Sequence, residues 1–204
     1  MGLKLNGSSS GSVALNAPAD TTSGADVVLT LPVNDGDSGQ YLQTDGSGGL
    51  SWQTVANVST AKVVDAKSSG TNGGTFTLGA DRTRDLNTKE DPDNIVTLSS
   101  NQFTLGAGTY LIQWTCPAFR VGRHQSHLYN VTDTAIQARG QSSQASNADT
   151  GESLSSGYYI ATITGDTVYE IRHRCSDTVT SNGFGHQCGF GTEIFTQLTI
   201  FKLS

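Results

Sequence analysis

The chain has 204 residues, of which 24 are glycine, and charged residues make up 15% of it with a net charge of −6 at pH 7. This acidic balance argues against general binding to nucleic acid, because a phosphate backbone calls for a basic face. No apolar run approaches the ~18 residues that a membrane span needs, so we expect no membrane insertion. The length allows one large β-domain, or a compact domain of roughly 110–140 residues that carries an arm.

The N-terminus and the cysteines bear on where the chain is made. The first ten residues contain no apolar segment of the kind that marks a secretory signal, so we expect synthesis in a cytoplasm and delivery by assembly or lysis. The three cysteines, Cys116, Cys175 and Cys188, cannot form a closed set of disulfides. They are typical of buried thiols in a reducing compartment, although a bridge between Cys175 and Cys188 stays open.

Residues 1–53 have the pattern of an extended arm, with short apolar pieces between turns of Gly, Ser, Asp and Asn. Asp45-Gly46 is a strong turn dipeptide between two extended pieces, 40–44 and 50–54, and predicts a small hairpin. An isolated hairpin is marginal in water, so the arm needs a partner surface. The side chains expected to anchor the arm are Leu3, Leu5, Val13, Leu15, Val28, Leu29 and Leu31.

Residues 54–93 form a transition, with strands expected over 55–64 and 75–78 and a solvated loop over 81–93. The strands within 54–80 can belong to the domain that follows. Over residues 94–204, runs with period-two alternation succeed one another between short Gly, Ser and Asn turns, which predicts an all-β sandwich or jelly roll. The strands are expected near 95–98, 102–105, 108–117, 125–132, 135–138, 153–164, 167–175 and 193–203.

Two stretches of the arm resemble a module of bacteriophage tail-fibre and appendage proteins. They read Leu29-Thr-Leu-Pro32 and Gly39-Gln-Tyr-Leu-Gln-Thr-Asp-Gly-Ser-Gly-Gly-Leu-Ser-Trp52. The resemblance implies a virion structural protein, made in the host cytoplasm, whose arm docks to a tail or capsid protein.

Residues 94–204 also resemble the jelly roll of tumour necrosis factor and complement heads. A Gly-x-Tyr strand start, a Gly-Asp-x-Val turn and an aromatic-aliphatic last strand recur in that family, and here they correspond to Gly108 and Tyr110, to Gly165, Asp166 and Val168, and to Phe195, Leu198 and Ile200. That family assembles as trimers, so the resemblance implies a homotrimer whose aromatic side chains divide between the sandwich core and the threefold axis. The candidates are Tyr110, Trp114, Tyr158, Tyr159, Tyr169, Phe195 and Phe201.

The histidines and cysteines do not have the spacing of a metal site. In a strand, the two rings of His124-x-x-His127 point to opposite sides, and the pairs His173/Cys175 and His186/Cys188 lack the Cys-x₂₋₄-Cys spacing of zinc sites. No nucleophile elbow, Walker loop or His-Glu-x-x-His motif occurs, and the acidic residues are scattered. We therefore expect no metal, no cofactor and no enzymatic activity.

Two segments rich in arginine and histidine stand out in this acidic chain, one from Arg120 to His127 and one from Arg172 to Arg174. They suit ion pairs with acids such as Asp133, Asp166, Glu170 and Asp177, or a basic patch for an anionic glycan or lipopolysaccharide on a host surface. In the loop over 178–190, aromatic residues alternate with glycines, which suits carbohydrate stacking and plain packing equally. The candidate residues for host-surface binding are Arg123, His124, His127, Phe184 and His186.

The sequence therefore predicts a homotrimeric, non-enzymatic fibre of a phage virion, with an attachment arm over 1–53 and a jelly-roll head for host adhesion over 94–204. One alternative is a capsid decoration or head-fibre protein that stabilises the shell. A second alternative is a glycan-cleaving enzyme of the tailspike type, which needs a cleft with two carboxylates.

Overall fold

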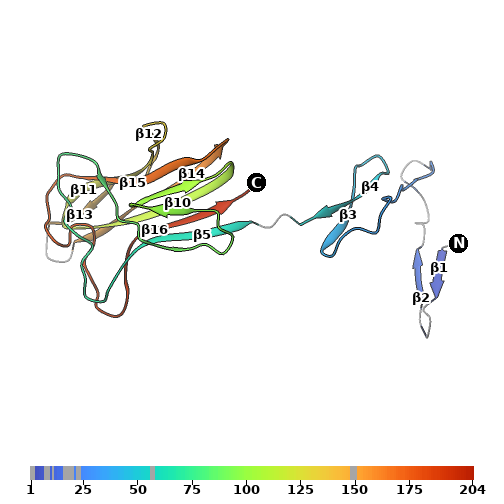
Figure 1. Ribbon diagram of the computed structural model, residues 1–204, viewed down its shortest axis with the longest axis horizontal. Coiled ribbons are helices and arrows are strands. Elements are labelled where there is room, and N and C mark those ends of the chain that lie inside the picture. Colours follow the sequence, from blue (N-terminus) through green and yellow to red (C-terminus); the bar gives the residue numbers. More distant parts are fainter. Residues whose placement is uncertain are drawn as a thin grey trace. The chain divides into compact units, whose positions relative to one another are not determined.

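The computed structural model describes residues 3–6, 10, 12–15, 21, 24–55, 58–147 and 151–204, and at 3–6 and 12–15 it describes the backbone alone. The chain divides into two units, Met1–Asn57 and Val58–Ser204, which we take in turn. Every regular element among the described residues is a β-strand (Figure 1).

The N-terminal unit contains two small hairpins. Strands β1 (Leu3–Asn6) and β2 (Ser12–Leu15) pair with each other, and β3 (Gln40–Thr44) pairs with β4 (Leu50–Thr54), which confirms the hairpin predicted around Asp45-Gly46. The chain before β3 joins this second hairpin through a parallel bridge between Thr30 and Gly49. The side chains of the expected anchors Leu3, Leu5, Val13 and Leu15 lie outside the described residues.

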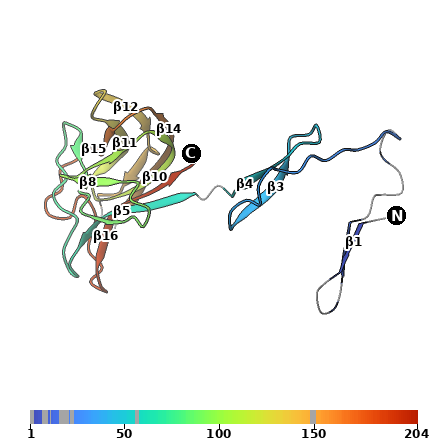
Figure 2. The same ribbon diagram turned by 45° about the vertical axis from the view of Figure 1, so that its right-hand side comes forward.

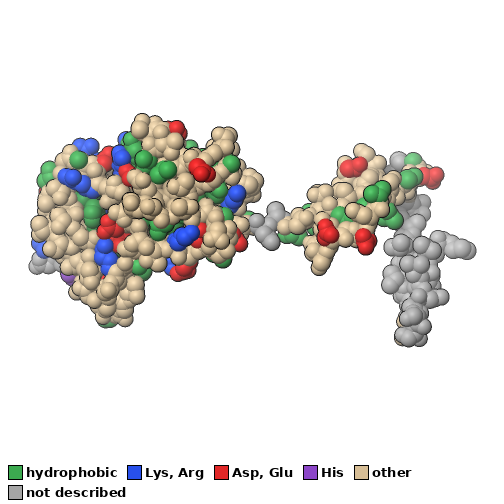
Figure 3. Space-filling view, viewed as in Figure 1, with side chains coloured by type: hydrophobic (Ala, Val, Ile, Leu, Met, Phe, Trp, Pro, Cys, Tyr) green, Lys and Arg blue, Asp and Glu red, His purple; other side chains and the backbone are tan. Residues whose placement is uncertain are grey.

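The second hairpin has no core of its own. None of the residues 24–55 is buried, and the apolar residues before β3 are largely exposed, with Val28 at 71%, Leu31 at 68% and Leu29 at 58%. Figure 3 shows hydrophobic side chains spread over the surface of this unit. Backbone pairing and side-chain hydrogen bonds hold the segment together, among them one of 2.9 Å from Trp52 Nε1 to the carbonyl of Asn34. Such a unit gains little stability from burial.

The second unit, which we call the head, consists of two antiparallel sheets that lie face to face (Figures 1 and 2). The front sheet contains, in spatial order, β14 (Glu152–Ile163), β10 (Gly108–Phe119), β16 (Glu193–Lys202), β5 (Ser59–Lys67) and β7 (Thr88–Glu90). The back sheet contains β12 (Ala135–Arg139), β11 (Gly122–Asn130), β15 (Thr167–Cys175), β9 (Gln102–Leu105) and β8 (Thr97–Ser99), with β13 (Ser143–Ala145) on β11 and β6 (Arg82–Thr83) on β15.

The pairing of the head strands is nested along the chain. The outermost strands β5 and β16 pair, as do β9 with β15, β10 with β14, and β11 with β12. A nested set of antiparallel pairs divided between two facing sheets is the topology of a jelly roll, because it is one long hairpin rolled up on itself. The predicted fold class is therefore confirmed.

The core lies between the two sheets and follows the alternation seen in the sequence. Tyr110, Ile112 and Trp114 point inward from β10, while Phe103 and Tyr169 come from the back sheet with ring centroids 5.6 Å apart. The Trp114 indole donates a hydrogen bond of 2.9 Å to Ser126 Oγ, so this large side chain is both packed and satisfied. Alternation thus decides which residues of each strand are inside.

Between residues 55 and 93, three local predictions differ from the structure. The loop expected over 81–93 contains the short strands β6 and β7, which the sequence hides because the residues of β7 are exposed and polar. The strand expected over 75–78 is wrong, since Phe76 makes an isolated bridge to Val179 and its neighbours turn at Gly74 and Gly79. The strand expected over 55–64 begins later, at Ser59, and extends to Lys67.

Candidate functional site

Strand β11 separates the two histidines of the segment 120–127 by its alternation. His124 points into the head and is 4% exposed, with its Nδ1 2.9 Å from His173 Nε2 and its Nε2 2.7 Å from Ser153 Oγ. Burial, assisted by the positive charge of Arg84, lowers the pKa of His124 to about 4. The pKa of His173 is lowered well below its usual value by burial and by Arg84. These two rings are therefore neutral members of the interior.

Arg84 is the buried cation at the centre of this interior group. Its guanidinium donates to Thr196 Oγ1 at 2.7 Å and to the carbonyls of Pro117 at 3.1 Å and Phe184 at 2.9 Å. The guanidinium also lies 4.3 Å from the centre of the Phe184 ring. Arg84 thus ties β16, β10 and the loop over 178–190 to one another, which is a structural task.

The outward face of the back sheet gathers the other basic residues. Arg123 and His127 point outward from β11, and Arg172 and Arg174 point outward from β15. The register places His127 between Arg139 of β12 and Arg172 of β15, and Arg174 beside Gln125. Two segments that are about fifty residues apart in sequence therefore meet on one surface.

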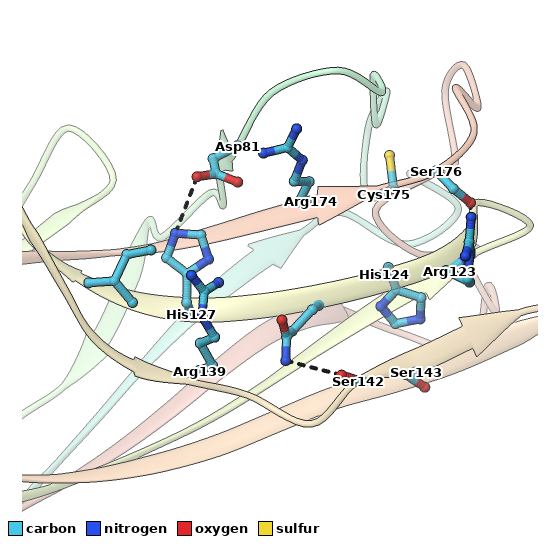
Figure 4. A pocket seen from close by; sticks show the side chains of 12 residues that line it. Asp81, Arg123, His124, His127, Arg139, Ser142, Ser143, Arg174, Cys175 and Ser176 are labelled. Atoms are coloured by element: carbon cyan, nitrogen blue, oxygen red, sulfur yellow. Dashed lines mark hydrogen bonds and ion pairs between the residues drawn. The ribbon is translucent and has the colours of Figure 1, made fainter.

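This surface is hollowed into a cavity of about 620 Å³ (Figure 4). It is lined by residues of β11, β12, β13 and β15 and of the turns beside them. The lining residues are Asp81, Arg123, His124, Gln125, His127, Ile136, Arg139, Ser142, Ser143, Arg174, Cys175 and Ser176. Three of the five residues expected to bind a host surface, Arg123, His124 and His127, are thus brought together here.

His127 and Asp81 form one wall of the cavity. The His127 ring is 2% exposed, and its Nε2 lies 3.6 Å from Asp81 Oδ2 without a hydrogen-bond partner among the described residues. Burial lowers the pKa of His127, Asp81 opposes that shift, and the nearby Arg139 and Arg172 reinforce it. His127 is therefore neutral near pH 7 and leaves the charge of the cavity to the arginines and Asp81.

The remaining two expected binding residues lie elsewhere in the head, in the loop over 178–190. Phe184 packs on Phe76 with ring centroids 4.4 Å apart, and His186 stacks on Phe119 at 4.9 Å. Neither residue lines the cavity, although His186 is exposed. The loop is held by the Glu193 carboxylate, which accepts backbone hydrogen bonds from residues 70, 188 and 189, so that its pKa falls to about 2.

The outward face of the front sheet carries a row of apolar side chains, whereas that of the back sheet carries basic ones. Ile160 of β14 is paired with Leu111 of β10, which is paired in turn with Phe201 of β16. All three alternate with core residues and so point away from the core. Ile160 is 59% exposed and the neighbouring Tyr158 is 69% exposed. We call these four residues, Leu111, Tyr158, Ile160 and Phe201, the apolar row.

The expected core and axis aromatics divide between these two environments. Tyr110, Trp114, Tyr169 and Phe195 are buried, at 1%, 2%, 1% and 4% exposure. Tyr159 packs against the core and donates a hydrogen bond of 3.0 Å from its hydroxyl to Gln137 Oε1. Tyr158 and Phe201 belong to the apolar row.

The described residues contain no cluster of three or more potential metal ligands and no helix with the length and hydropathy of a membrane span. All three cysteines are free thiols, so Cys175 and Cys188 are not paired. Asp81 is the single carboxylate among the lining residues of the cavity, where a glycan-cleaving enzyme needs two.

Sequence reasoning missed Arg139 and Asp81 as parts of the site. Arg139 stands alone in the sequence, with no basic residue among its near neighbours, and Asp81 lies in a polar stretch rich in charge. What brings them to the cavity is the pairing of β12 with β11 and of β6 with β15. Because pairing register is a tertiary property, no local signal in the sequence indicates either residue.

Comparison by sequence finds no matching family model and no matching curated protein. Similar solved structures include the globular domain of zebrafish complement 1qA protein, with 16% identity over 72% of this chain and 98% of that chain and a TM-score of 0.45. Murine APRIL at pH 5.0 has 10% identity over 72% and 100%, with a TM-score of 0.46. Eiger TNF from S. frugiperda has 12% identity over 72% and 93%, with a TM-score of 0.47. At such identities and scores the likeness decides nothing about function, and the jelly roll is assigned from its nested strand pairing.

Proposed function

We propose that this chain is a non-enzymatic, homotrimeric surface-binding protein, anchored by its N-terminal unit and binding through its head. The observation that carries the proposal is the apolar row on the front sheet. Leu111, Ile160 and Phe201 are neighbours on adjacent strands, so they form a continuous apolar strip and not scattered exposed side chains. A strip of this kind, on the face of a regular sheet, is typical of an interface with another protein.

A second copy of the chain is the partner that fits the strip best. The strip is uncharged, and it lies on the sheet that includes the strand next to the C-terminus, β16. In a closed ring of three copies each strip is covered, because every subunit presents and receives the same surfaces. This arrangement also leaves the basic face of the back sheet open to a ligand.

Trimer formation would also give the exposed apolar side chains of the N-terminal unit a surface on which to pack. The segment over 24–55 exposes Val28, Leu29 and Leu31 and buries none of its residues. Three copies held together by their heads bring three such segments to a high local concentration, where they can bury those side chains against one another or against a shared partner. This supports an anchoring role for the N-terminal unit.

In its finer form, the proposal is that the chain is a fibre of a bacteriophage virion that adheres to the host surface. Its support is the resemblance of residues 29–52 to a module of tail-fibre and appendage proteins. Capsid decoration is the second candidate, and the exposed apolar residues at 27–33 favour it, because an extended apolar segment suits contact across neighbouring capsid subunits.

Removal of residues 1–57 tests the division of labour. The head contains the complete jelly roll, so we expect the truncated protein to keep a mass of three chains and to keep binding to host cells. We expect it to lose co-sedimentation with virions, while the full chain retains it. A truncated head that is monomeric contradicts trimerisation through the front sheet.

Two further outcomes separate the candidates. If the full chain co-sediments with tail-free capsids and the head shows no binding to cells, capsid decoration replaces adhesion as the function. If neither virions, tails nor capsids take up the full chain, the virion role fails, while the mass measurement still decides on the trimer.

A further inference from the structure

The arginines that line the cavity are unusual in having no partner. In the described part of the chain, the other lysine and arginine side chains each make a hydrogen bond, an ion pair or a contact with an aromatic ring; they are Lys62, Lys67, Arg82, Arg84, Lys89, Arg120, Arg172 and Lys202. The side chains of Arg123, Arg139 and Arg174 make none of these, and all three line the same cavity.

Arg172 shows how an arginine on this face can be paired within the chain. Arg172 lies on the same face, pairs with Glu170 and stacks over the Tyr129 ring at 3.4 Å from its centre. Two of the acids that the sequence suggests as partners for these arginines bind other side chains, since Asp133 binds Asn130 and Asp177 binds Ser176. Internal ion pairing therefore accounts for Arg172 and leaves the cavity arginines unexplained.

The three free guanidinium groups come from three different strands. Arg123 lies on β11, Arg139 on β12 and Arg174 on β15, and Figure 4 shows them at separate points around the cavity. The chain has a net charge of −6, yet among the described residues these three cations share the cavity with a single carboxylate, that of Asp81. A local excess of positive charge with unused donors, in an acidic protein, attracts and can bind an anion.

We propose that this cavity binds an acidic saccharide, with its carboxylate or sulfate groups held by Arg123, Arg139 and Arg174. This deepens the proposed adhesion function by naming the class of surface ligand, and it rests on that function for its biological meaning. The binding itself requires a folded head and does not require the trimer.

The rest of the lining favours a sugar over other anions. Gln125, Ser142 and Ser143 offer amide and hydroxyl groups, and Asp81 can accept hydrogen bonds from sugar hydroxyls. Gln125 already donates to the carbonyl of Gly140 at 2.9 Å and to Ser142 Oγ at 3.1 Å, so the polar lining is ordered. Apart from the imidazoles, none of the described residues that line the cavity offers an aromatic ring on which a nucleotide base could stack.

The size of the cavity agrees with this class of ligand. Its volume of about 620 Å³ lies within the range of roughly 300–1,000 Å³ that small-molecule sites occupy. The three arginines lie at separate points around the cavity (Figure 4), which suits a ligand with more than one anionic group. An acidic oligosaccharide presents such groups at repeated intervals.

The test is binding of defined oligosaccharides to the full chain by calorimetry. The probes are tetragalacturonate, which has carboxylates alone, a heparin-derived tetrasaccharide, which adds sulfates, and neutral maltotetraose. We expect the wild-type protein to bind at least one acidic probe and not maltotetraose. Because a hydrogen bond to a charged group contributes about tenfold or more in affinity, the variant Arg139→Gln/Arg174→Gln should weaken that binding by about a hundredfold.

The matched control is Lys62→Gln, which removes a cation that is 46% exposed on the opposite sheet. It should leave binding unchanged, and Arg123→Gln should weaken binding by itself. The proposal is overturned if the double variant and the control weaken binding of the acidic probe equally. It is also overturned if maltotetraose binds as tightly as the acidic probes. Inorganic sulfate serves as a competitor of the acidic saccharide. If sulfate displaces the saccharide when both are present at equal concentration, the cavity is a simple anion site and the proposal is overturned.

Failure here and failure of the proposed function are distinguishable. A protein with the mass of three chains that adheres to cells and binds neither acidic probe keeps its function and loses this site. A monomeric protein that binds tetragalacturonate in an arginine-dependent manner keeps the site and loses the trimeric fibre.

Discussion

The two sheets of the head show opposite chemistry on their outward faces although they share one core. The front sheet presents Leu111, Ile160 and Phe201 in one row, while the back sheet presents Arg139, His127 and Arg172 in one row. The strands behind both rows alternate in the same way, with every second residue in the core. What distinguishes the faces is therefore the identity of the outward residues alone.

Because its two outward faces differ in chemistry, a jelly roll can bind two different partners at once. Inward residues specify the fold, and the two sheets contribute side chains of the same type to the core. The back sheet contributes Phe103 and Tyr169, and the front sheet contributes Tyr110 and Trp114. Outward residues do not pack in the core, so one face can carry apolar residues that bind a protein and the other can carry charged residues that bind a soluble ligand.

Replacement of Ile160 by aspartate should have the largest effect on this comparison. A carboxylate in the apolar row would be buried without a partner in the trimer, and we expect complete loss of the trimer. Because Ile160 is 59% exposed in the single chain, the head should stay folded. Light scattering coupled to gel filtration measures the mass. The matched change on the back sheet, Ile136→Asp, should leave the trimer intact, and a trimer that survives Ile160→Asp contradicts the assignment of the two faces.

Loss of the trimer should in turn weaken adhesion without altering the cavity. On a surface densely coated with the acidic saccharide, three linked sites gain avidity of about a hundredfold or more over one site. We therefore expect Ile160→Asp to lose that factor in surface binding and to keep the wild-type affinity for one soluble tetrasaccharide. Equal surface binding by wild type and variant would show that the three cavities do not act together.

The inward histidines predict a loss of stability in acid. The pKa of His124 is about 4 in the folded chain, below its ordinary value of 6.5. Above pH 6.5 both states leave the ring neutral, and between pH 6.5 and 4 the unfolded chain takes up a proton that the folded chain excludes. From this group alone we expect a loss of about 2 kcal/mol in unfolding free energy between pH 7.5 and 5.

Urea unfolding at the two pH values measures this loss. The variant His124→Gln should be less stable at both values, and its stability should fall less between them than that of the wild type. His173, on the same interior group, adds a loss of the same sign. A pH dependence identical in wild type and variant would show that the histidine pair is not what senses acid.

Gly157 offers a smaller test, which concerns the core behind the apolar row. It faces inward against Trp114, and a methyl group there would come within 2.6 Å of Trp114 Cη2. Because the indole is held by Ser126, it cannot move freely, and Gly157→Ala should cost about 1–3 kcal/mol. Gly165→Ala, which meets no atom within 4 Å, is the control and should be close to neutral in thermal unfolding.

The sequence predicts the fold well where the alternation is long and apolar. The predicted bounds lie close to the observed ones for two long strands of the head, the one with Tyr110, Ile112 and Trp114 and the one with Phe195 and Leu198. For the hairpin around Asp45-Gly46, the predicted and observed strands have the same bounds. The prediction misses short polar strands such as β7, because nothing in their composition distinguishes them from a loop.

Part of the candidate site lies in segments that the sequence singles out, and the rest depends on register. The segments around Arg123 and Arg174 suit either internal ion pairs or a basic patch, and β11 and β15 lie side by side. Arg139 and Asp81 reach the cavity through other strand pairs, which a single sequence does not reveal. The placement of His124 inside and His127 outside follows from strand alternation once the strand is known.

The mass of the full chain in solution shows whether the apolar face joins subunits and leaves the basic face free. Light scattering on the purified protein, over a range of dilutions, should return three times the chain mass of 21.4 kDa. A mass of 21.4 kDa at every concentration would leave the apolar row uncovered and would contradict the account of the two faces.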